Sequence, residues 1–387
     1  MKRFISVLLA VCMLFSLVTM SFAGYKEDAK LQFRANGKFK ILALADVQDR
    51  YPMEPAVIQF ISEALDFTSP DLVVFVGDNI LGTDPKSIEQ MVTPLVERGV
   101  PFTFVFGNHD DQEGYEKDDQ LAEYQKYAGC LAYDADPALH GSATHNLPIL
   151  SSDGSKVAFN LWLFDSGASY RDEEGNYLGY DWVRADQIAW YNTVRDEMTA
   201  ENGGELIPSL AFQHIIPQEP CQKIFVESPV NLGELTINCS DGTSTTFIPD
   251  VTQYEGMIFE KSCPSYGNDG QWDAMVQGGD VLGLVVGHDH VNNFIADVDG
   301  VDLIQTPGAT YNSYHNNMFQ GARVIELNEA DLWNYETYNV TSNELAKRDD
   351  SKLDEVGGRN DYDFFYTFEK IFSAIYRFFI KILNGEL

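Results

Sequence analysis

The sequence predicts an α/β protein built on parallel strands, and three observations support this fold class. Short runs of apolar and β-branched residues alternate with segments of helical periodicity, which is typical of parallel strands joined by crossover helices. Side chains that suit metal binding stand at or just past the ends of several strand-like runs. The chain has 387 residues, so it can bury a large core.

The first half of the chain supplies the clearest alternation of strands and helices. Strands are predicted at residues 38–45, 71–76 and 101–106, and the helices between them at residues 55–67 and 85–100. In parallel sheets of this kind, ligands bind beyond the carboxyl ends of the strands. The polar residues that follow the three strands are therefore expected to converge, and they include Asp46, Asp78 and Asn108.

The second half of the chain is expected to form a second sheet. Its predicted strands are residues 157–164, 208–212 and 281–286, with a helix at residues 184–198 and later short strands at residues 293–298, 301–305 and 322–327. Residues 217–279 are rich in Gly, Ser, Asn and Cys, so we interpret them as a long insertion into a domain that spans residues 24–341.

The two ends of the chain have compositions of their own. Residues 1–23 have the charged start, apolar centre and small-residue end of a secretory signal peptide, which predicts a secreted or cell-surface protein. An uncleaved membrane anchor is the alternative. Residues 342–362 are polar and predict a linker. Residues 363–387 predict an amphipathic helix whose apolar and basic residues, at 364–383, could contact a membrane interface or envelope. Packing on the domain or on a second copy is the other interpretation of this helix.

Net charge narrows the choice of partners, and cysteine content indicates whether disulfides can form. The formal net charge of −33 repels nucleic-acid backbones and attracts cations, so we expect a small substrate and no nucleic acid. Four cysteines follow the signal segment, and an even number in an exported chain permits disulfides. One bridge within the insertion and free buried thiols are both consistent with the positions Cys130, Cys221, Cys239 and Cys263.

Five short motifs carry candidate metal ligands in a fixed order along the chain. They are Asp46-Val47-Gln48, Gly77-Asp78-Asn79, Gly107-Asn108-His109-Asp110, Gln213-His214-Ile215 and Gly287-His288-Asp289-His290. Carboxylate, amide and imidazole ligands suit a pair of divalent metals. Together the motifs resemble the calcineurin-like metallophosphoesterase superfamily, and within it the bacterial and fungal phosphatases related to the purple acid enzymes. The resemblance covers about residues 38–328.

The resemblance implies a four-layer α/β/β/α metallophosphoesterase sandwich that holds two neighbouring metal ions. Carried onto the matching positions, it makes Asp78 the ligand shared by both metals. The first metal would also take Asp46 and His290. The second would also take the three remaining ligands, Asn108, His214 and His288. The ions are divalent or mixed-valence, and the ligand types permit Fe, Zn, Mn, Mg or Ca.

Two positions depart from patterns known in the superfamily. Most members have a histidine where this chain has Gln48, so Gln48 is a further candidate ligand, and a weaker one than imidazole. Purple acid phosphatases supply a tyrosine where this chain has Leu81, so the colour of an iron–tyrosinate bond is not expected.

The resemblance also implies the reaction, which is hydrolysis of a phosphate monoester by a hydroxide that the two metals activate. His109 is expected to be the catalytic residue that contacts the phosphate or protonates the leaving oxygen, and Asp110 is expected to orient it. Two alternatives stay open. One is a phosphodiesterase that acts on cyclic nucleotides or phospholipid head groups, and the other is a catalytically silent surface binding protein that keeps its metals for structure.

Overall fold

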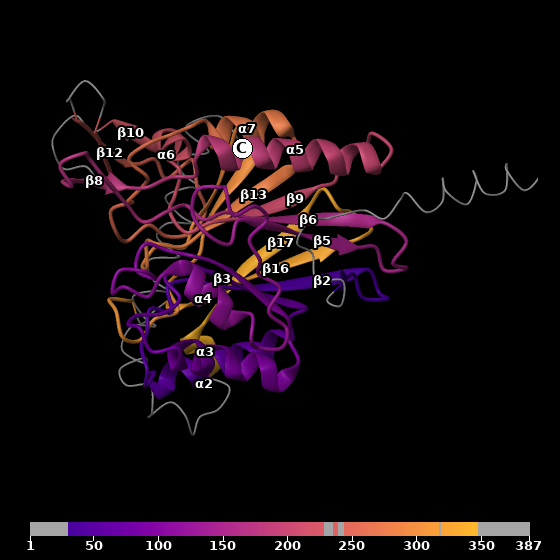
Figure 1. The fold of residues 1–387 in the computed structure, drawn as a ribbon. Coiled ribbons are helices and arrows are strands. Elements are labelled where there is room, and N and C mark those ends of the chain that lie inside the picture. Colours follow the sequence, from indigo (N-terminus) through magenta and orange to yellow (C-terminus); the bar gives the residue numbers. More distant parts are fainter. Residues whose placement is uncertain (1–29, 228–234, 239–243, 317–318, 347–387) are drawn as a thin grey trace, which may run out of the picture.

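Two β-sheets pack face to face and helices cover their outer faces, so the chain forms four layers in the order α/β/β/α (Figure 1). The structure, a computed structural model, describes residues 30–227, 235–238, 244–316 and 319–346. This architecture confirms the fold class that the sequence predicts.

The five-stranded sheet has the strand order β17-β16-β2-β3-β4. Its strands β2 (Lys38–Leu44), β3 (Leu72–Val76) and β4 (Phe102–Val105) are parallel, as the alternation of strands and helices predicts. β16 (Gly321–Asn328) pairs antiparallel with β2, and β17 (Tyr335–Thr341) pairs antiparallel with β16. Every residue of β3 is buried, as expected for a strand covered on both faces.

The position of β16 corrects one prediction. Residues 322–327 were expected to complete the second sheet, but β16 pairs with β2 of the first. Its neighbouring residues face different cores: Val324 packs against the helices and Ile325 packs between the sheets. β16 is buried over most of its length, as a central strand of either sheet would be, so its sequence does not reveal its partner.

The seven-stranded sheet has the strand order β1-β5-β6-β9-β13-β15-β14. Its centre consists of four parallel strands, β6 (Val157–Leu163), β9 (Ser209–Phe212), β13 (Val281–Val286) and β15 (Val301–Gln305). β14 (Ile295–Val298) pairs antiparallel with β15, and β5 (His145–Leu150) pairs antiparallel with β6. At the edge, β1 (Leu31–Gln32) pairs parallel with β5. β2 and β3 of the other sheet, like β9 and β13 of this one, are parallel neighbours, and all four lead into predicted ligands.

Helices close the two outer layers. α2 (Pro55–Thr68), α3 (Lys86–Arg98) and α4 (Lys117–Tyr124) cover the five-stranded sheet, while α5 (Ala185–Glu201) and α7 (Gln271–Gly278) cover the other (Figure 1). Local sequence sets the ends of α2 and α3. Pro55 opens α2, where its fixed φ suits a first turn, and Gly99 ends α3 in the left-handed region at φ 65°.

The inner core lies between the two sheets and holds their strands in fixed positions relative to each other. Ile41 and Val74 from one sheet pack with Phe212, Val285 and Ile304 from the other, and all five side chains are fully buried. Burial of this apolar area stabilises the fold and fixes the carboxyl ends of β2, β3, β9 and β13 relative to one another.

The remaining elements lie around this framework. β7 (Ser169–Arg171) and β8 (Tyr177–Tyr180) form a hairpin. Within residues 217–279, which the sequence marks as an insertion, α6 (Gln218–Ile224) is followed by a small sheet of β10 (Phe225–Glu227), β12 (Ser244–Pro249) and β11 (Leu235–Asn238). α8 (Ser342–Ala346) follows β17.

Several predictions concern residues beyond the described part of the chain. The signal peptide (residues 1–23), the helix at residues 363–387, Cys239 and most of the linker at residues 342–362 lie outside it. Cys221 and Cys263 are free thiols, so no bridge joins these two cysteines of the insertion. Within the described ranges, no helix has the length and apolar character that crossing a membrane requires.

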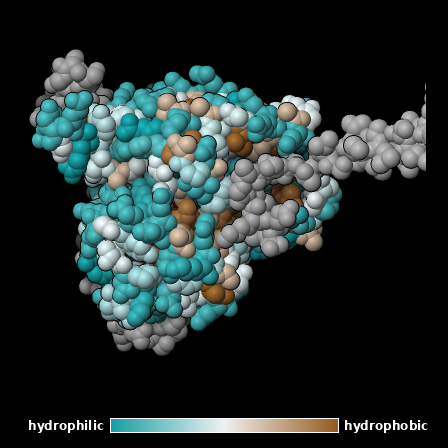
Figure 2. Space-filling view, viewed as in Figure 1, coloured by the Kyte–Doolittle hydropathy of each residue, from teal (hydrophilic) through white to brown (hydrophobic). Residues whose placement is uncertain are grey.

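The surface agrees with the acidic composition. In the view of Figure 2 most of the described surface is hydrophilic, and apolar residues appear scattered among polar ones. The net charge of −33 leaves this surface strongly anionic and favourable to cations.

Candidate metal centre

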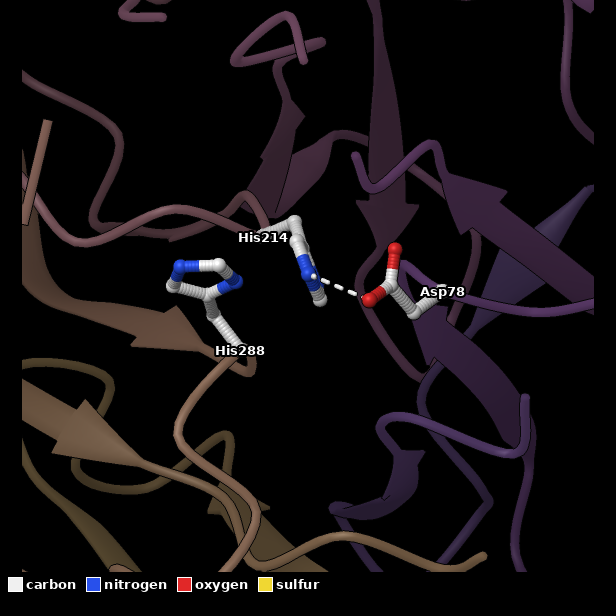
Figure 3. Close-up of side chains that lie close together, drawn as sticks. All are labelled: Asp78, His214 and His288. Carbon is white, nitrogen blue, oxygen red and sulfur yellow. Dashed lines mark ion pairs between the residues drawn. The ribbon is translucent and has the colours of Figure 1, made fainter. Parts of the chain in front are cut away.

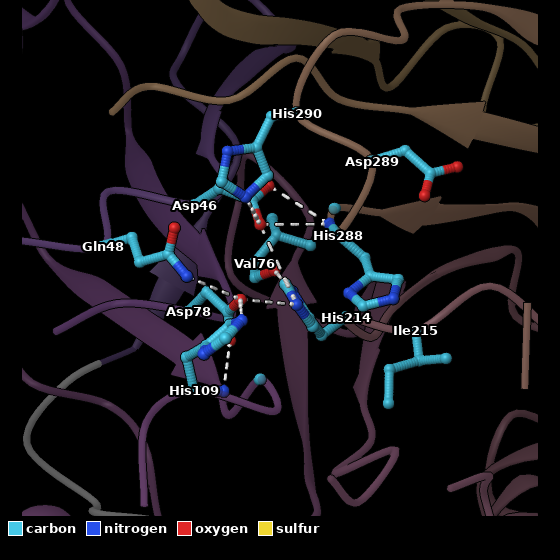
Figure 4. Close-up of polar contacts among 12 residues, drawn as sticks. Asp46, Gln48, Val76, Asp78, His109, His214, Ile215, His288, Asp289 and His290 are labelled. Atoms are coloured by element: carbon cyan, nitrogen blue, oxygen red, sulfur yellow. Dashed lines mark hydrogen bonds and ion pairs between the residues drawn. The ribbon is translucent and has the colours of Figure 1, made fainter. Parts of the chain in front are cut away.

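The predicted ligands sit at equivalent places on four strands from the two sheets. Asp46, Asp78, His214 and His288 each follow the last residue of their strand by two positions, after β2, β3, β9 and β13 respectively. The carboxyl ends of these parallel strands meet where the two sheets face each other. Five of the predicted ligands therefore converge on one place, with His290 as the fifth (Figure 4).

The converging side chains form two overlapping triads that share Asp78. One triad is Asp46, Asp78 and His290, and the other is Asp78, His214 and His288. In each, one ligand atom per residue lies within 4.8 Å of the others, and every member is buried. Figure 3 shows the second triad, with the imidazole of His214 between the ring of His288 and the carboxylate of Asp78.

Short distances between carboxylates and imidazoles connect the two triads. His214 Nε2 is 3.2 Å from Asp78 Oδ2 and 3.8 Å from Asp46 Oδ1. His290 Nε2 is 3.5 Å from Asp46 Oδ1. These spacings bring the donor atoms of the two triads close enough to surround two neighbouring cations. Asp78 belongs to both triads, so it is placed to bridge two ions.

Hydrogen bonds on the far side of two imidazoles fix which nitrogen faces the centre. His214 Nδ1–H donates to the carbonyl oxygen of Val76 at 2.9 Å, and His290 Nδ1–H donates to that of Tyr314 at 2.8 Å. In the neutral ring, the Nε2 lone pair of each histidine then points inward. Metal-binding histidines characteristically have such a second hydrogen bond, which sets the tautomer and the ring plane.

Buried polar atoms without a hydrogen bond mark the same place. Asn108 Oδ1, His288 Nε2 and Gln48 Oε1 are buried and have no hydrogen-bond partner within the described structure. An unsatisfied buried polar atom costs about 1–3 kcal/mol, so a group of them at one site needs an explanation. Two cations would satisfy them, and the carboxylate, amide and imidazole donors fit divalent ions of the kind that the sequence predicts.

The backbone at the site adopts conformations that non-glycine residues seldom take. Asp46, Gln48, Asp78 and His288 have φ values of 52°, 46°, 49° and 76°. Each left-handed residue of this kind costs about 1–3 kcal/mol and persists only where its surroundings impose it. Four of them at one site show that the fold holds the ligand loops in place at the expense of local stability.

Close packing explains the glycines that precede these ligands. A Cβ on Gly107 would lie 2.2 Å from Asp78 Oδ1, and a Cβ on Gly77 would lie 2.5 Å from His214 Nδ1. The segment after Gly107 is also tied to the shared carboxylate, because the backbone N–H of His109 donates to Asp78 Oδ1 at 2.7 Å. Asn108 lies between Gly107 and His109 in sequence, so the loop holds its backbone beside Asp78.

Burial and neighbouring charges shift the pKa values of the five central ligands. At His214 burial is outweighed by the charges of Asp78 and Asp46, which raise its pKa to about 9, so this imidazole must lose a proton when it binds a metal. Burial raises the pKa of Asp46 well above its usual range. For Asp78, the pKa is lowered, because the charge and hydrogen bond of His214 outweigh burial. Burial lowers the pKa of His288 far below its usual range and lowers that of His290 to about 4. His288 and His290 are therefore neutral at neutral pH, which is the state in which imidazole binds a metal.

His109 lies at the edge of the centre. Its side chain is 37% exposed, and its Nε2 is 4.0 Å from Asp78 Oδ2. Its Nδ1 contacts the amide oxygen of Gln112, so Nδ1 carries hydrogen. Its Nε2 is directed toward the shared carboxylate of Asp78 (Figure 4). This placement suits a group that meets the substrate and does not bind the metals.

The predicted pairing of Asp110 with His109 is wrong. Asp110 is buried, and its carboxylate accepts backbone N–H groups from Gly107 at 2.7 Å, Asn79 at 2.8 Å and Ile80 at 3.1 Å. It therefore joins the loop after β4 to the loop after β3. Gln112, three residues beyond His109, holds the imidazole instead.

The motif Gly287 to His290 reaches the centre by a turn. The motif does not continue the strand, because β13 ends at Val286. The N–H of Asp289 donates to the carbonyl oxygen of Gly287 at 3.0 Å around a left-handed His288. In Figure 4 the carboxylate of Asp289 is directed away from Asp46. It accepts hydrogen bonds from Asn292 and from the N–H of Cys263.

Gln48 lies beside the shared carboxylate. Its side chain is buried and its Nε2 is 3.5 Å from Asp78 Oδ2, while Oε1 has no hydrogen-bond partner in the described structure. The sequence analysis missed other residues that hold the ligands. Tyr314 lies flat on His290, and Gln305 Nε2 donates to the carbonyl oxygen of Gly287 at 2.7 Å. An aromatic or an amide in a loop has no spacing signal that would reveal these contacts.

The comparisons with known proteins agree with this geometry. A model of the calcineurin-like phosphoesterase family matches residues 39–292, and the chain belongs to this family of metallophosphoesterases. The match includes the motifs that supply Asp46, Asp78, Asn108, His214, His288 and His290. The resemblance predicted from the motifs is thereby confirmed.

Individual relatives place the chain near the purple acid phosphatases. "Probable inactive purple acid phosphatase 14" of Arabidopsis thaliana is 28% identical over 340 residues, which cover 78% of each chain. "Phosphatase DCR2" of Saccharomyces cerevisiae is 28% identical over 296 residues, which are 68% of this chain and 46% of that protein. Among solved structures, a dimetal phosphatase from Danio rerio aligns with a TM-score of 0.45 and 14% identity, over 78% of this chain and 98% of that one.

Proposed function

We propose that this protein is a dinuclear-metal phosphatase that hydrolyses phosphate monoesters. The observation that carries the proposal is the pair of buried triads that share Asp78, with His109 at their edge. A purely structural metal site has no use for a half-exposed imidazole beside the shared carboxylate. A hydrolase needs one, because the leaving oxygen must gain a proton.

The chain's own residues have separable tasks in this reaction. Bound at the two triads, cations would activate a water molecule and neutralise charge on the phosphoryl oxygens. Asp78, Asp46 and the buried imidazoles hold those cations. His109 acts on the substrate: its Nδ1 is engaged by Gln112, so its protonated form presents the Nε2–H to a phosphoryl oxygen or to the leaving oxygen.

A catalytically silent binding protein is the competing candidate, and two observations favour it. The chain has Gln48 where most of the superfamily has an imidazole. The Arabidopsis relatives are named as probable inactive phosphatases. Against this reading, the described structure retains the remaining ligands and a partly exposed His109.

The test compares turnover of p-nitrophenyl phosphate and bis(p-nitrophenyl) phosphate by the purified protein. Activity is measured as isolated, after chelation, and after Mn²⁺, Zn²⁺ or Fe²⁺ is restored. The proposal predicts chelator-sensitive turnover with the monoester preferred, and its loss in Asp78→Ala. Asp196→Ala is the matched control, because its side chain is 70% exposed. Preference for the diester would favour the phosphodiesterase, and no turnover with any metal would favour the binding protein.

We also propose that the protein is exported and acts outside the cytoplasm. Residues 1–23 support this by their charged start and apolar centre. Amino-terminal sequencing of the protein from its producing cells tests it. Export predicts a mature chain that begins at Gly24, and an intact Met1 in the cytoplasmic fraction would contradict it.

A further inference from the structure

One candidate ligand, His290, is contacted by a single tyrosine on both the face and the edge of its imidazole. The imidazole of His290 and the ring of Tyr314 are stacked, with centroids 4.1 Å apart and planes 6° from parallel. The same tyrosine accepts the Nδ1–H of His290 on its backbone carbonyl oxygen at 2.8 Å. Tyr314 thus contacts both the face and the edge of the imidazole, which restricts both tilt and rotation of the ring.

A carboxylate from the insertion completes the arrangement. The hydroxyl of Tyr314 donates to Glu260 Oε2 at 3.0 Å, and Glu260 Oε1 accepts the backbone N–H of Val291 at 2.7 Å. Val291 is the residue next to His290, so the contacts form a closed ring through four residues. Asn292 ties down the backbone of Glu260, because its Oδ1 accepts the Glu260 N–H at 3.1 Å.

The first metal position is the one that needs such support. Its triad contains a single imidazole, that of His290, with Asp46 and Asp78. The second triad has two imidazoles, and the family resemblance adds Asn108 to it from the loop that packs against Asp78. The family resemblance places Gln48 at the first position, where its neutral amide is a weaker ligand than the histidine of most members. In the structure, Gln48 Nε2 lies 3.5 Å from the shared carboxylate of Asp78.

We propose that Tyr314 and Glu260 are positioning residues that hold His290 in the orientation the first metal requires. The inference rests on the metal centre of the proposed function, and it gives the insertion at residues 217–279 a role in that centre. Groups that orient a metal ligand from outside the coordination shell typically change metal affinity about 10–100-fold when they are removed. The effect is expected at the first position alone.

The experiment titrates metal-free protein with Zn²⁺ or Mn²⁺ against a competing chelator and resolves two binding steps. Tyr314→Ala removes the ring and the hydroxyl but keeps the carbonyl acceptor. It should weaken one step about 10–100-fold and leave the other unchanged. Tyr314→Phe keeps the stacked ring, and Glu260→Gln keeps an acceptor for Val291, so both should have smaller effects on the same step.

Tyr338→Ala is the matched control. Tyr338 is 40% exposed and its hydroxyl donates to Glu326 Oε1 at 3.0 Å, so it is another tyrosine–glutamate pair. It lies in the antiparallel pairing of β17 with β16, and it contacts none of the ligands. Its substitution should leave both binding steps unchanged.

The outcomes separate this inference from the proposed function. Two metal steps in the unmodified protein, one of them weakened in Tyr314→Ala, would support the positioning role even if no phosphate ester were turned over. Two unchanged steps in folded Tyr314→Ala, with turnover intact, would overturn the positioning role and leave the phosphatase standing. Fewer than two steps in the unmodified protein would also overturn it, since there would be no first metal to support.

Discussion

Replacement of Gly77 by alanine tests how closely the strand end after β3 fits the ligand from β9. The new Cβ would lie 2.5 Å from His214 Nδ1 and 2.6 Å from its Cγ. To restore ordinary contact, the imidazole would have to retreat by about 1 Å. A misplacement of that size can lower a reaction rate about 100-fold. The retreat would also break the hydrogen bond from His214 to Val76.

The backbone adds a second, separable cost. Gly77 has φ 83°, and an alanine in this region costs about 1–3 kcal/mol of stability. Gly204→Ala is the matched control, because Gly204 has φ 93° with no atom within 4 Å of its Cβ position. Gly204 precedes β9, whereas His214 follows it, so the control lies at the opposite end of that strand.

Both variants are assayed for thermal stability, metal content and turnover of p-nitrophenyl phosphate. Both should melt at lower temperature than the parent. Gly77→Ala alone should lose one metal and about 100-fold in turnover. If folded Gly77→Ala kept two metals and full activity, His214 could not be a ligand in the position described.

Three further predictions concern single side chains. His109→Ala should lower turnover about 10²–10⁴-fold with unchanged metal content, and a matching loss of metal would instead make His109 a ligand. Asp280→Ala should lower the free energy of unfolding in urea by about 3 kcal/mol, because buried Trp162 Nε1–H and Tyr191 O–H both donate to this carboxylate. A loss below about 1 kcal/mol would show that these two hydrogen bonds do not stabilise the fold as described. Burial lowers the pKa of His145 from its ordinary value near 6.5 to about 4. Between pH 6.5 and pH 4 the unfolded chain therefore binds more protons than the folded protein, and stability falls as the pH drops through this range. From pH 7 to pH 5 the parent should lose about 2 kcal/mol more unfolding free energy than His145→Gln, and equal losses would contradict the shift.

The convergence of the candidate ligands was predictable because two independent regularities agree on it. Strand ends in a parallel sheet share one edge, and Asp46 and Asp78 follow their strands by the same two residues. His214 and His288 repeat that spacing in the other sheet. The motif order then identified the family, so the fold could be assigned without knowledge of every strand.

What the sequence could not predict depends on contacts between distant segments. Asp110 is adjacent to His109, yet its carboxylate bonds to backbone N–H groups because the two loops meet there. β16 joins β2 across 280 residues of sequence, since Arg323 pairs with Ala43. Tyr314 and Glu260 have no motif at all. Their roles arise from the way the loop at residue 314 and the insertion at residue 260 fold against His290.

The central claim is that Asp78 bridges two metals, one in each triad. Anomalous diffraction from crystals of the purified protein, collected on either side of the absorption edge of the bound metal, tests it most directly. We expect two peaks, one beside Asp46 and His290 and the other beside His214 and His288, with the Asp78 carboxylate between them. A single peak, or two peaks that do not both contact Asp78, would contradict it.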